Sequence, residues 1–418
     1  MQVAANRLRS DLEANAQFGV LPDVDGHGRT VLTGTDENKR ARDRFVRRLE
    51  DAGLEVRVDA VGNIVGRWVS PDADPSLAPV ATGSHLDSVP SGGIFDGPLG
   101  TYGALEAVRT IQESSIAVER PIHVVCFTEE EGQRFGNGML GSLVATGRMT
   151  VEEALSLEDE SGTSLETALE QIGYRGEGRT HAAEWDAWLE LHVEQGKRLE
   201  EAGATAGVVT SISGITHCYV DVTGEADHAG STPMGDRSDA LAAASELVLD
   251  LESAADRIVS TESESAVGTV GKAVVSPNAT NVIPETVRLG VDIRDVDAES
   301  MDALVAALEE SVRRVESDRG VDVSITQPYD IAPEPMAERC REALLGAGAE
   351  TGAEIMSLHS GAAHDTMNVA RVTDAGLLFS PSRNGISHNP KEWTDWDDCA
   401  SAASVLAAAV ARLAASES

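Results

Sequence analysis

The sequence predicts an α/β protein whose mostly parallel sheet is interrupted by an inserted α+β domain. Three short apolar runs, at 79–83, 122–127 and 187–193, are typical of buried strands, and a helical pattern covers 101–114. Strands that alternate with helices in this way indicate a mostly parallel sheet. From about residue 212 apolar residues alternate with polar ones, which is typical of half-exposed strands in an antiparallel sheet.

The inserted segment is expected to have its own strands and helices. Alternating strands are expected at 216–226, 265–276 and 285–295, and helices at 238–259 and 299–317. Two helices on one face of an antiparallel sheet would make a small α+β domain.

The αβ pattern resumes after the segment TQPYDIAPEP. A helix at 336–347, a strand at 375–380 and a final helix from about 395 are expected there. We therefore expect one domain to consist of residues 1–212 and 330–418, and a second domain to consist of residues 213–329.

The composition is strongly acidic. The chain has 33 Lys and Arg against 70 Asp and Glu, a formal net charge of −37. Such a charge argues against nucleic-acid binding, which needs basic surface to displace counter-ions. The carboxylates recur in short clusters, which is typical of a solvated acidic surface, and their mutual repulsion needs screening. We therefore expect a salt-rich cytoplasm.

Other sequence features agree with a cytoplasmic location. The four cysteines, Cys126, Cys218, Cys340 and Cys399, share no short spacing and are typical of a reduced compartment. No apolar run approaches the roughly 20 residues that a membrane span requires. The N-terminal residues lack the apolar core of a signal peptide. We expect a protein without membrane association.

Chemistry-bearing residues follow the first predicted strand. His85 is expected just beyond its end, and Asp87 and Asp96 lie in the glycine-rich turns of GSHLDSVPSGGIFDGPLG. Glycines allow the chain to bend back and bring His85 close to Asp96. A phosphate loop is excluded, because the G-x-x-x-x-G-K-[ST] pattern is absent and two aspartates would repel phosphate. An ordinary surface turn is the structural alternative.

Similar residues follow the other two strands of this series. Three adjacent glutamates, 129–131, would repel one another unless a cation lies among them, and one can ligate a metal while its neighbour acts as a base. His192 ends the third strand and Gln195 follows it, and His388 lies in a late Ser/Asn/Gly loop. Ligands of parallel α/β sheets bind at the carboxyl ends of the strands. A solvated acidic turn and a core histidine are the structural alternatives.

This set of nitrogen and oxygen ligands suits two divalent metal ions, Zn²⁺, Mn²⁺ or Co²⁺. Paired metal ions can bridge a water, lower its pKa and polarise a carbonyl. Asp96 suits the bridging position. Asp87, so close to His85, suits a supporting acceptor that fixes the histidine tautomer.

Eight motifs in order resemble those of the hydantoinase/carbamoylase family of bimetal amidohydrolases, which is related to dizinc aminopeptidases. They run from about residue 80 to 395 and comprise GSHLDSVPSGGIFDGPLG, EEEGQRF, ELHVEQG, DHAGSTPM, PNATNVIPE, VDIRD, SGAAHDT and RNGISHNPKEW. The family includes N-carbamoyl-L-amino-acid hydrolases, allantoate amidohydrolases and β-ureidopropionases.

The resemblance implies a role for each residue of the expected metal centre. The implied ligands are His85, Asp96, Glu131, His192 and His388, with Asp96 bridging the two ions. Glu130, beside a ligand, becomes the general base. Spacing alone leaves the choice among the three glutamates open.

The resemblance also implies that the inserted domain is a lid and a dimer interface. His228 resembles a histidine that reaches the partner's active site and stabilises the oxyanion. Asn281 and Arg294 resemble a clamp on the substrate carboxylate, which a planar guanidinium can hold with two hydrogen bonds, and Gln195 is a further contact. Without the family, an exposed loop histidine and a surface salt bridge of Arg294 are the ordinary interpretations.

Two positions depart from the family pattern. Ser88 stands where threonine is usual, and Ala363 stands where glycine is common, beside His364. His364 is expected to support the site from behind the ligands.

The function implied is hydrolysis of a linear ureido or amide C–N bond in a small carboxylate-bearing molecule. An N-carbamoyl-L-amino acid is the expected substrate, and allantoate, then β-ureidopropionate or an acylated amino acid, are the alternatives. A non-catalytic binding protein on the same fold is the alternative of a different class.

Overall fold

The computed structural model describes residues 1–136 and 138–415. The chain divides into two compact units, Met1–Thr210 with Met336–Ser418, and Ser211–Pro335. The first unit contains a mixed sheet, and the second contains a separate antiparallel sheet. The predicted α/β class with a mostly parallel central sheet is confirmed.

Four parallel strands form the centre of the first sheet, in the order β4-β3-β5-β13, and antiparallel strands flank them on both sides. β2 and β1 continue the sheet beyond β4, and β6 continues it beyond β13. The bounds are β1 Glu55–Val58, β2 Ile64–Trp68, β3 Val80–His85, β4 Ile122–Phe127, β5 Ala187–Val193, β6 Ala206–Ile212, β11 Glu334–Pro335, β12 Ile355–Ser360 and β13 Asp374–Ser380.

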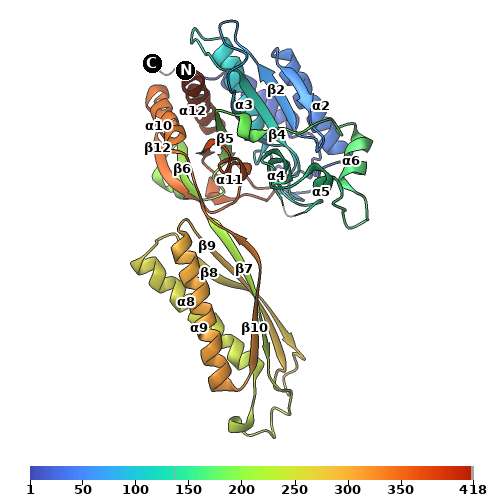
Figure 1. Ribbon diagram of the computed structural model, residues 1–418, viewed down its shortest axis with the longest axis vertical. Helices are drawn as coiled ribbons and strands as arrows, with labels where there is room; N and C mark the ends of the chain where they lie inside the picture. The colour runs from blue at the N-terminus through green and yellow to red at the C-terminus, as the bar shows by residue number, and fades with distance from the viewer. Residues whose placement is uncertain (137, 416–418) are drawn as a thin grey trace. The chain divides into compact units, whose positions relative to one another are not determined.

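Helices cover both faces of this sheet, so its central strands are buried on both sides. α3 packs on β3 and β5, and α12 packs beside α3 and α10 (Figure 1). The alanine-rich sequence of α12 favours a helix and its small side chains allow close packing. The bounds are α1 Ala5–Asn15, α2 Asp36–Asp51, α3 Pro98–Gln112, α4 Leu140–Ala145, α5 Val151–Leu155, α6 Leu165–Ile172, α7 Arg198–Ala202, α10 Glu338–Thr351, α11 Asp365–Val369 and α12 Trp396–Ala414.

The expected end of the first strand was wrong by two residues. Ser84 and His85 pair in parallel with Cys126 and Phe127 of β4, so β3 runs through His85. His85 is therefore held by the sheet itself and does not lie in the loop beyond it.

The second unit consists of four antiparallel strands in the order β10-β7-β9-β8. Two helices lie along one face of this sheet (Figure 1). The apolar side chains between the helices and the sheet form a core that is separate from the core of the first unit. The bounds are β7 Gly214–Thr223, α8 Ala240–Thr261, β8 Val267–Ser276, β9 Thr286–Asp295, α9 Ala298–Arg319 and β10 Asp322–Ile331.

β10 is the one strand of this four-stranded sheet that the sequence pattern did not predict. It is an edge strand without a buried residue, and its pairing with β7 shifts register between Thr326 and Tyr329, around Pro328. Proline is tolerated in a sheet at edges and at bulges. The proline-containing segment that we expected to end the inserted domain is therefore a bulge inside β10.

Within the described residues, every helix is too short or too polar to cross a membrane. The four cysteines are buried and unbridged.

Candidate active site and metal centre

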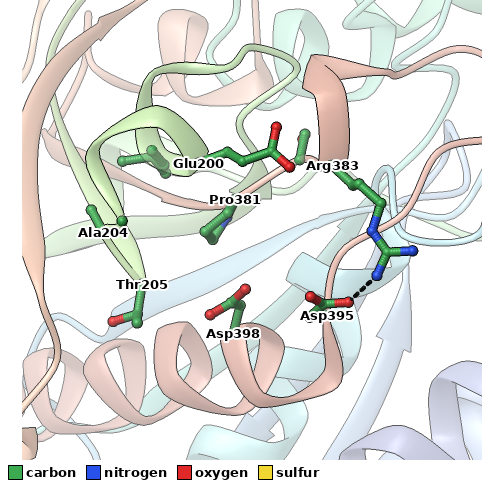
Figure 2. Close-up of a pocket in the computed structure, with 10 residues that line it drawn as sticks. Glu200, Ala204, Thr205, Pro381, Arg383, Asp395 and Asp398 are labelled. Atoms are coloured by element: carbon green, nitrogen blue, oxygen red, sulfur yellow. Dashed lines mark hydrogen bonds and ion pairs between the residues drawn. The ribbon is translucent and has the colours of Figure 1, made fainter.

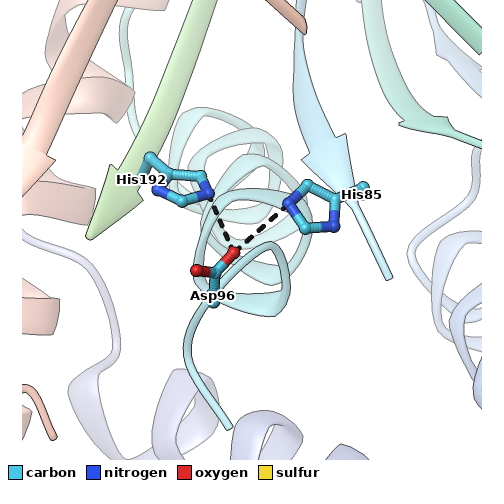
Figure 3. Close-up of side chains that lie close together, drawn as sticks. All are labelled: His85, Asp96 and His192. Atoms are coloured by element: carbon cyan, nitrogen blue, oxygen red, sulfur yellow. Dashed lines mark ion pairs between the residues drawn. The ribbon is translucent and has the colours of Figure 1, made fainter. Parts of the chain in front are cut away.

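The carboxyl ends of β3 and β5 bring two histidines to one carboxylate. β3 and β5 are parallel neighbours, so their last residues lie at the same edge of the sheet. Asp96 Oδ1 lies 3.4 Å from His85 Nε2 and 3.2 Å from His192 Nε2 (Figure 3). All three side chains are buried.

A glycine allows the Asp96 loop to approach His85. Gly97 has φ +80, and a Cβ there would lie 2.6 Å from the His85 ring. A side chain at this position would force the ring and the loop apart. Gly97 also directly precedes α3, which begins at Pro98.

The other oxygen of Asp96 faces a second group of ligands. Asp96 Oδ2 lies 3.5 Å from His388 Nε2, and Glu131 Oε2 lies 3.4 Å from the same nitrogen. Asp96 thus contributes to two ligand groups, one with His85 and His192 and one with Glu131 and His388. A carboxylate between two such groups could be shared by two metal ions.

The three adjacent glutamates point to different places. Glu129 turns away from the ligands and accepts the backbone N–H groups of Arg134 and Phe135 at 2.6 and 2.7 Å. Glu130 Oε2 lies 3.5 Å from His85 Nε2, and Glu131 faces His388. The positive φ of Glu129, +55, produces this turn at the end of β4.

The carboxylates of the cluster favour bound protons, because burial and mutual repulsion disfavour their charged forms. Burial, reinforced by nearby carboxylates, raises the pKa of Glu130 well above its usual value and that of Glu131 to about 8. Burial opposes protonation of the histidines, but the carboxylates outweigh it, so the pKa of His192 rises to about 8 and that of His85 also rises. Bound cations would replace these protons.

The residues present fit divalent metal ions. In each ligand group the candidate atoms lie within 4.8 Å of one another. His85 Nε2 is buried and makes no hydrogen bond within the described part of the chain, which leaves it free to ligate. Imidazole and carboxylate ligands suit Zn²⁺, Mn²⁺ and Co²⁺.

Asp87 supports the site differently from the expectation. Its backbone carbonyl, and not its carboxylate, makes the close contact with His85 Nδ1, at 3.2 Å. Its carboxylate Oδ2 accepts the Glu131 N–H at 3.1 Å. The carbonyl oxygen can only accept, so Nδ1 carries the proton and Nε2 faces the ligand group with its lone pair.

Gln195 and His364 line the same region. Gln195 Nε2 donates to Asp96 Oδ2 at 2.9 Å, and its backbone is left-handed with φ +59. The His364 ring packs edge-on against His192 with centroids 4.5 Å apart. Burial and the neighbouring His192 hold the pKa of His364 well below its usual value, so it is a neutral neighbour of the ligands.

The remaining predicted site residues lie in the second unit. His228 is exposed, and its Nδ1 accepts the backbone N–H groups of Gly230 and Ser231 at 2.9 and 3.2 Å. Because backbone N–H groups only donate, the neutral ring carries its proton on Nε2. The backbone carbonyl of Asn281 accepts the N–H of Ala229, the residue that follows His228, at 3.0 Å, and this holds Asn281 beside His228.

Arg294 makes the ion pair that the ordinary interpretation of the sequence predicted. Its Nε and Nη2 donate to the two oxygens of Asp292 at 2.9 and 3.0 Å. His217 Nε2 lies 3.1 Å from the same carboxylate. This pair holds the guanidinium in a defined orientation on β9.

Three residues beside the ligands were missed by sequence reasoning. Arg29 is a fully buried cation from the N-terminal segment, and burial lowers its pKa. Ser387 and Glu392 form hydrogen bonds to the Asp96 loop. Ser387 and Glu392 lie in the motif RNGISHNPKEW, in which the histidine is the residue typical of a metal ligand, and no motif surrounds Arg29.

A separate open cavity lies near the start of α12. It is lined by Glu200, Asp395 and Asp398 with Arg383, which pairs with Asp395 (Figure 2). Three carboxylates against one paired arginine do not suit a carboxylate-bearing molecule. This cavity is therefore not the binding place for such a substrate.

An α/β fold with a cluster of histidine and carboxylate side chains at the carboxyl edge of its sheet, which could hold metal ions, is typical of a metal-dependent hydrolase. The model of peptidase family M20/M25/M40 matches residues 81–412, and the chain belongs to this family.

Relatives within this family carry amidohydrolase names. An N-carbamoyl-L-amino acid amidohydrolase of Geobacillus stearothermophilus is 40% identical over 99% of this chain and 100% of its own length. An allantoate amidohydrolase of Bacillus subtilis is 35% identical over 93% of each chain. A crystal structure of an amidase of the hydantoinase/carbamoylase family from Burkholderia multivorans has a TM-score of 0.92 at 37% identity, covering 100% of this chain and 99% of its own. The predicted resemblance to the hydantoinase/carbamoylase family is confirmed.

Proposed function

We propose that this chain hydrolyses the C–N bond of N-carbamoyl-L-amino acids, with Glu130 as general base and two divalent metal ions as cofactors. The products would be the L-amino acid and carbamic acid, which decomposes to ammonia and carbon dioxide. The observation that supports this most directly is the shared carboxylate of Asp96, which faces a ligand group with each of its oxygens. Relatives that are 40% and 35% identical carry the names N-carbamoyl-L-amino acid amidohydrolase and allantoate amidohydrolase.

His85, Asp96 and His192 would hold one metal ion, and Asp96, Glu131 and His388 would hold the other, with Zn²⁺ as the expected metal. When bound, the metal ions supply positive charge that acidifies water and polarises the substrate carbonyl.

Glu130 would transfer the proton between the attacking water and the leaving nitrogen. Its carboxylate is buried beside His85, and burial raises its pKa well above that of an ordinary glutamate. A base with a raised pKa can take a proton from water and return it to the amine nitrogen near neutral pH.

Residues of the second unit would recognise the rest of the substrate. The Nε2–H of His228 would reach the partner's active site and donate to the oxyanion there, which needs a preorganised donor. Arg294 and Asn281 would hold the substrate carboxylate, with Gln195 as a further contact. Closure of the second unit as a lid would bring Arg294 and Asn281 to the substrate.

An ammonia-release assay with zinc-loaded protein tests this proposal. N-carbamoyl-L-amino acids, allantoate and β-ureidopropionate would be compared at equal concentrations in high salt. The highest kcat/KM is expected for an N-carbamoyl-L-amino acid. A clear preference for allantoate would instead assign the chain to the second candidate, and no hydrolysis of any of them would reject the proposal.

Arg294→Gln is expected to raise KM for the carbamoyl substrate and to lower kcat/KM about ten- to a hundredfold, because a charged hydrogen bond is worth about 1.5–3 kcal/mol. Steady-state kinetics would measure this. The matched control is Arg288→Gln on the same strand, since Arg288 is exposed and pairs with Asp221. Equal effects of the two substitutions would contradict the clamp.

We infer that the second unit also forms a homodimer interface. β8 is an edge strand of its sheet and exposes Val267 and Val274. An edge with apolar side chains can pair with a second copy. Light scattering is expected to give the mass of a dimer, and Val274→Asp is expected to shift it toward the monomer, whereas a monomeric wild type would contradict the interface.

The acidic surface leads us to infer a salt-rich cytoplasm for this chain. With a net charge of −37, counter-ion screening reduces repulsion within the folded state. The melting temperature is expected to rise as KCl is increased from about 0.2 to about 2 M, a range over which the Debye length falls to a few ångströms. A melting temperature that is independent of KCl would contradict the inference.

A further inference from the structure

Glu392 is a buried carboxylate that contacts the metal centre without belonging to either ligand group. It is 1% exposed and lies four residues beyond His388. Its Oε1 accepts the backbone N–H groups of Phe95 and Asp96 at 2.9 and 3.0 Å. It therefore holds the main chain of the shared ligand.

The second oxygen of Glu392 connects this loop to the loop of His388. Glu392 Oε2 accepts from Ser387 Oγ at 2.9 Å, and the same hydroxyl lies 2.8 Å from Asp96 Oδ2. A hydroxyl has a single proton, so it bonds to one carboxylate at a time and keeps the other within reach. Asp96 and His388, far apart in the sequence, are thus joined through Glu392 and Ser387.

His388 needs such support more than the other histidine ligands do. His85 and His192 are the buried ends of sheet strands, whereas the side chain of His388 is 51% exposed. Its backbone is left-handed, with φ +53, a conformation that costs free energy for a residue with a side chain. Hydrogen bonds from neighbouring residues must therefore hold this loop in place.

The space around Glu392 is shaped to receive its carboxylate. A Cβ at position 93 would lie 2.2 Å from Glu392 Oε1, so glycine is required at Gly93. Arg29 Nε donates to the Gly93 carbonyl at 2.9 Å, and its buried positive charge interacts with Glu392 more strongly than with any other carboxylate. The Glu392 carboxylate thus lies between the backbone of Phe95 and Asp96, which it binds, and the Arg29 guanidinium, whose positive charge compensates its negative charge.

We propose that Glu392 is a positioning residue that fixes the Asp96 carboxylate relative to His388 and so sets the affinity of the Asp96–Glu131–His388 group for its metal ion. The inference rests on the proposed metal-dependent function, but it concerns binding of the ion and not turnover. Residues that orient metal ligands typically contribute about 10- to 100-fold to metal affinity.

Zinc titration of the metal-stripped full-length protein tests this proposal. Competition with a chelator and elemental analysis would give the number of ions bound and the affinity of each. The wild type is expected to bind two zinc ions. Glu392→Ala is expected to keep the tighter ion and to bind the second at least about tenfold more weakly.

Two milder substitutions keep the test decisive if Glu392→Ala folds poorly. Glu392→Gln keeps an oxygen for the two backbone N–H groups but replaces the other acceptor with a donor, and Ser387→Ala removes the hydroxyl connection alone. Both are expected to weaken the second ion, by less than Glu392→Ala does.

Asp59→Asn is the matched control. Asp59 is also a buried carboxylate that accepts backbone N–H groups, those of Val61 and Asn63, but it contacts no ligand. Asp59→Asn is expected to lower the melting temperature and to leave both ions bound. Unchanged binding of the second ion in all variants of Glu392 and Ser387, or equal loss in Asp59→Asn, would overturn the proposal. Two bound ions in a wild type that hydrolyses no ureido substrate would reject the proposed function and leave this inference standing.

Discussion

Replacing Glu130 with glutamine is expected to lower kcat by about a thousandfold or more, while two metal ions stay bound. General acid–base catalysis contributes about 10²- to 10⁴-fold, and the amide of glutamine can neither take nor return a proton. Glu130 is buried 3.5 Å from His85 Nε2 and stands outside the two groups that share Asp96. Ammonia release and elemental analysis of the same sample would measure both quantities.

The neighbouring Glu129→Gln is the matched control for this prediction. Glu129 is the more deeply buried glutamate of the two, and its carboxylate accepts two backbone N–H groups of the following loop. It is expected to retain most of the activity. Because His85, Glu130 and Glu131 also lie close enough to hold an ion together, loss of metal from Glu130→Gln would show that Glu130 is a ligand and contradict its role as base.

Asp96→Asn is expected to abolish activity by removing metal from both ligand groups. Each Asp96 oxygen faces a different group, and an amide nitrogen cannot ligate a metal ion, so one group loses a ligand and both lose negative charge. Elemental analysis should find fewer than two ions per chain. Wild-type protein stripped with a chelator should lose activity too and regain it with Zn²⁺, Mn²⁺ or Co²⁺, whereas Asp96→Asn should not regain it.

Asp87→Asn is the matched control, because it distinguishes the effect of losing a ligand from the effect of losing a nearby carboxylate. Asp87 is also a carboxylate close by, but it accepts the Glu131 N–H and belongs to none of the ligand groups found among the described residues. Its substitution is expected to weaken metal binding about 10- to 100-fold and to be rescued by excess metal. A full, unrescuable loss in Asp87→Asn, or two ions bound by Asp96→Asn, would contradict the assignment of Asp96.

The sequence pattern predicted the central architecture well. β4 and β5 begin and end where their apolar runs do, because a strand buried on both faces is mostly apolar along its length. β10 was missed, since an edge strand with a proline bulge has no such requirement. An apolar sequence pattern therefore indicates a buried strand, and an exposed strand can form without one.

The candidate ligands could be named from sequence because ligands of a parallel sheet follow strand ends. His85 and His192 end neighbouring strands, so their proximity follows from topology. The separate roles of the three adjacent glutamates could not be assigned from their spacing. The left-handed backbone conformation of Glu129 turns the chain, so that Glu129 accepts backbone N–H groups whereas Glu130 and Glu131 face the histidines.

The sequence by itself therefore determined the fold class, the family and a set of ligand types, because apolar periodicity and motif order are properties of the chain. Tertiary structure alone decided that the two oxygens of Asp96 face different ligand groups. It also decided that Glu392 and Arg29 hold the loop behind them. These contacts join residues that are distant in the sequence, 64 positions apart for Arg29 and Gly93 and 296 for Asp96 and Glu392. They depend on burial and hydrogen bonds, which leave no periodic mark on the sequence.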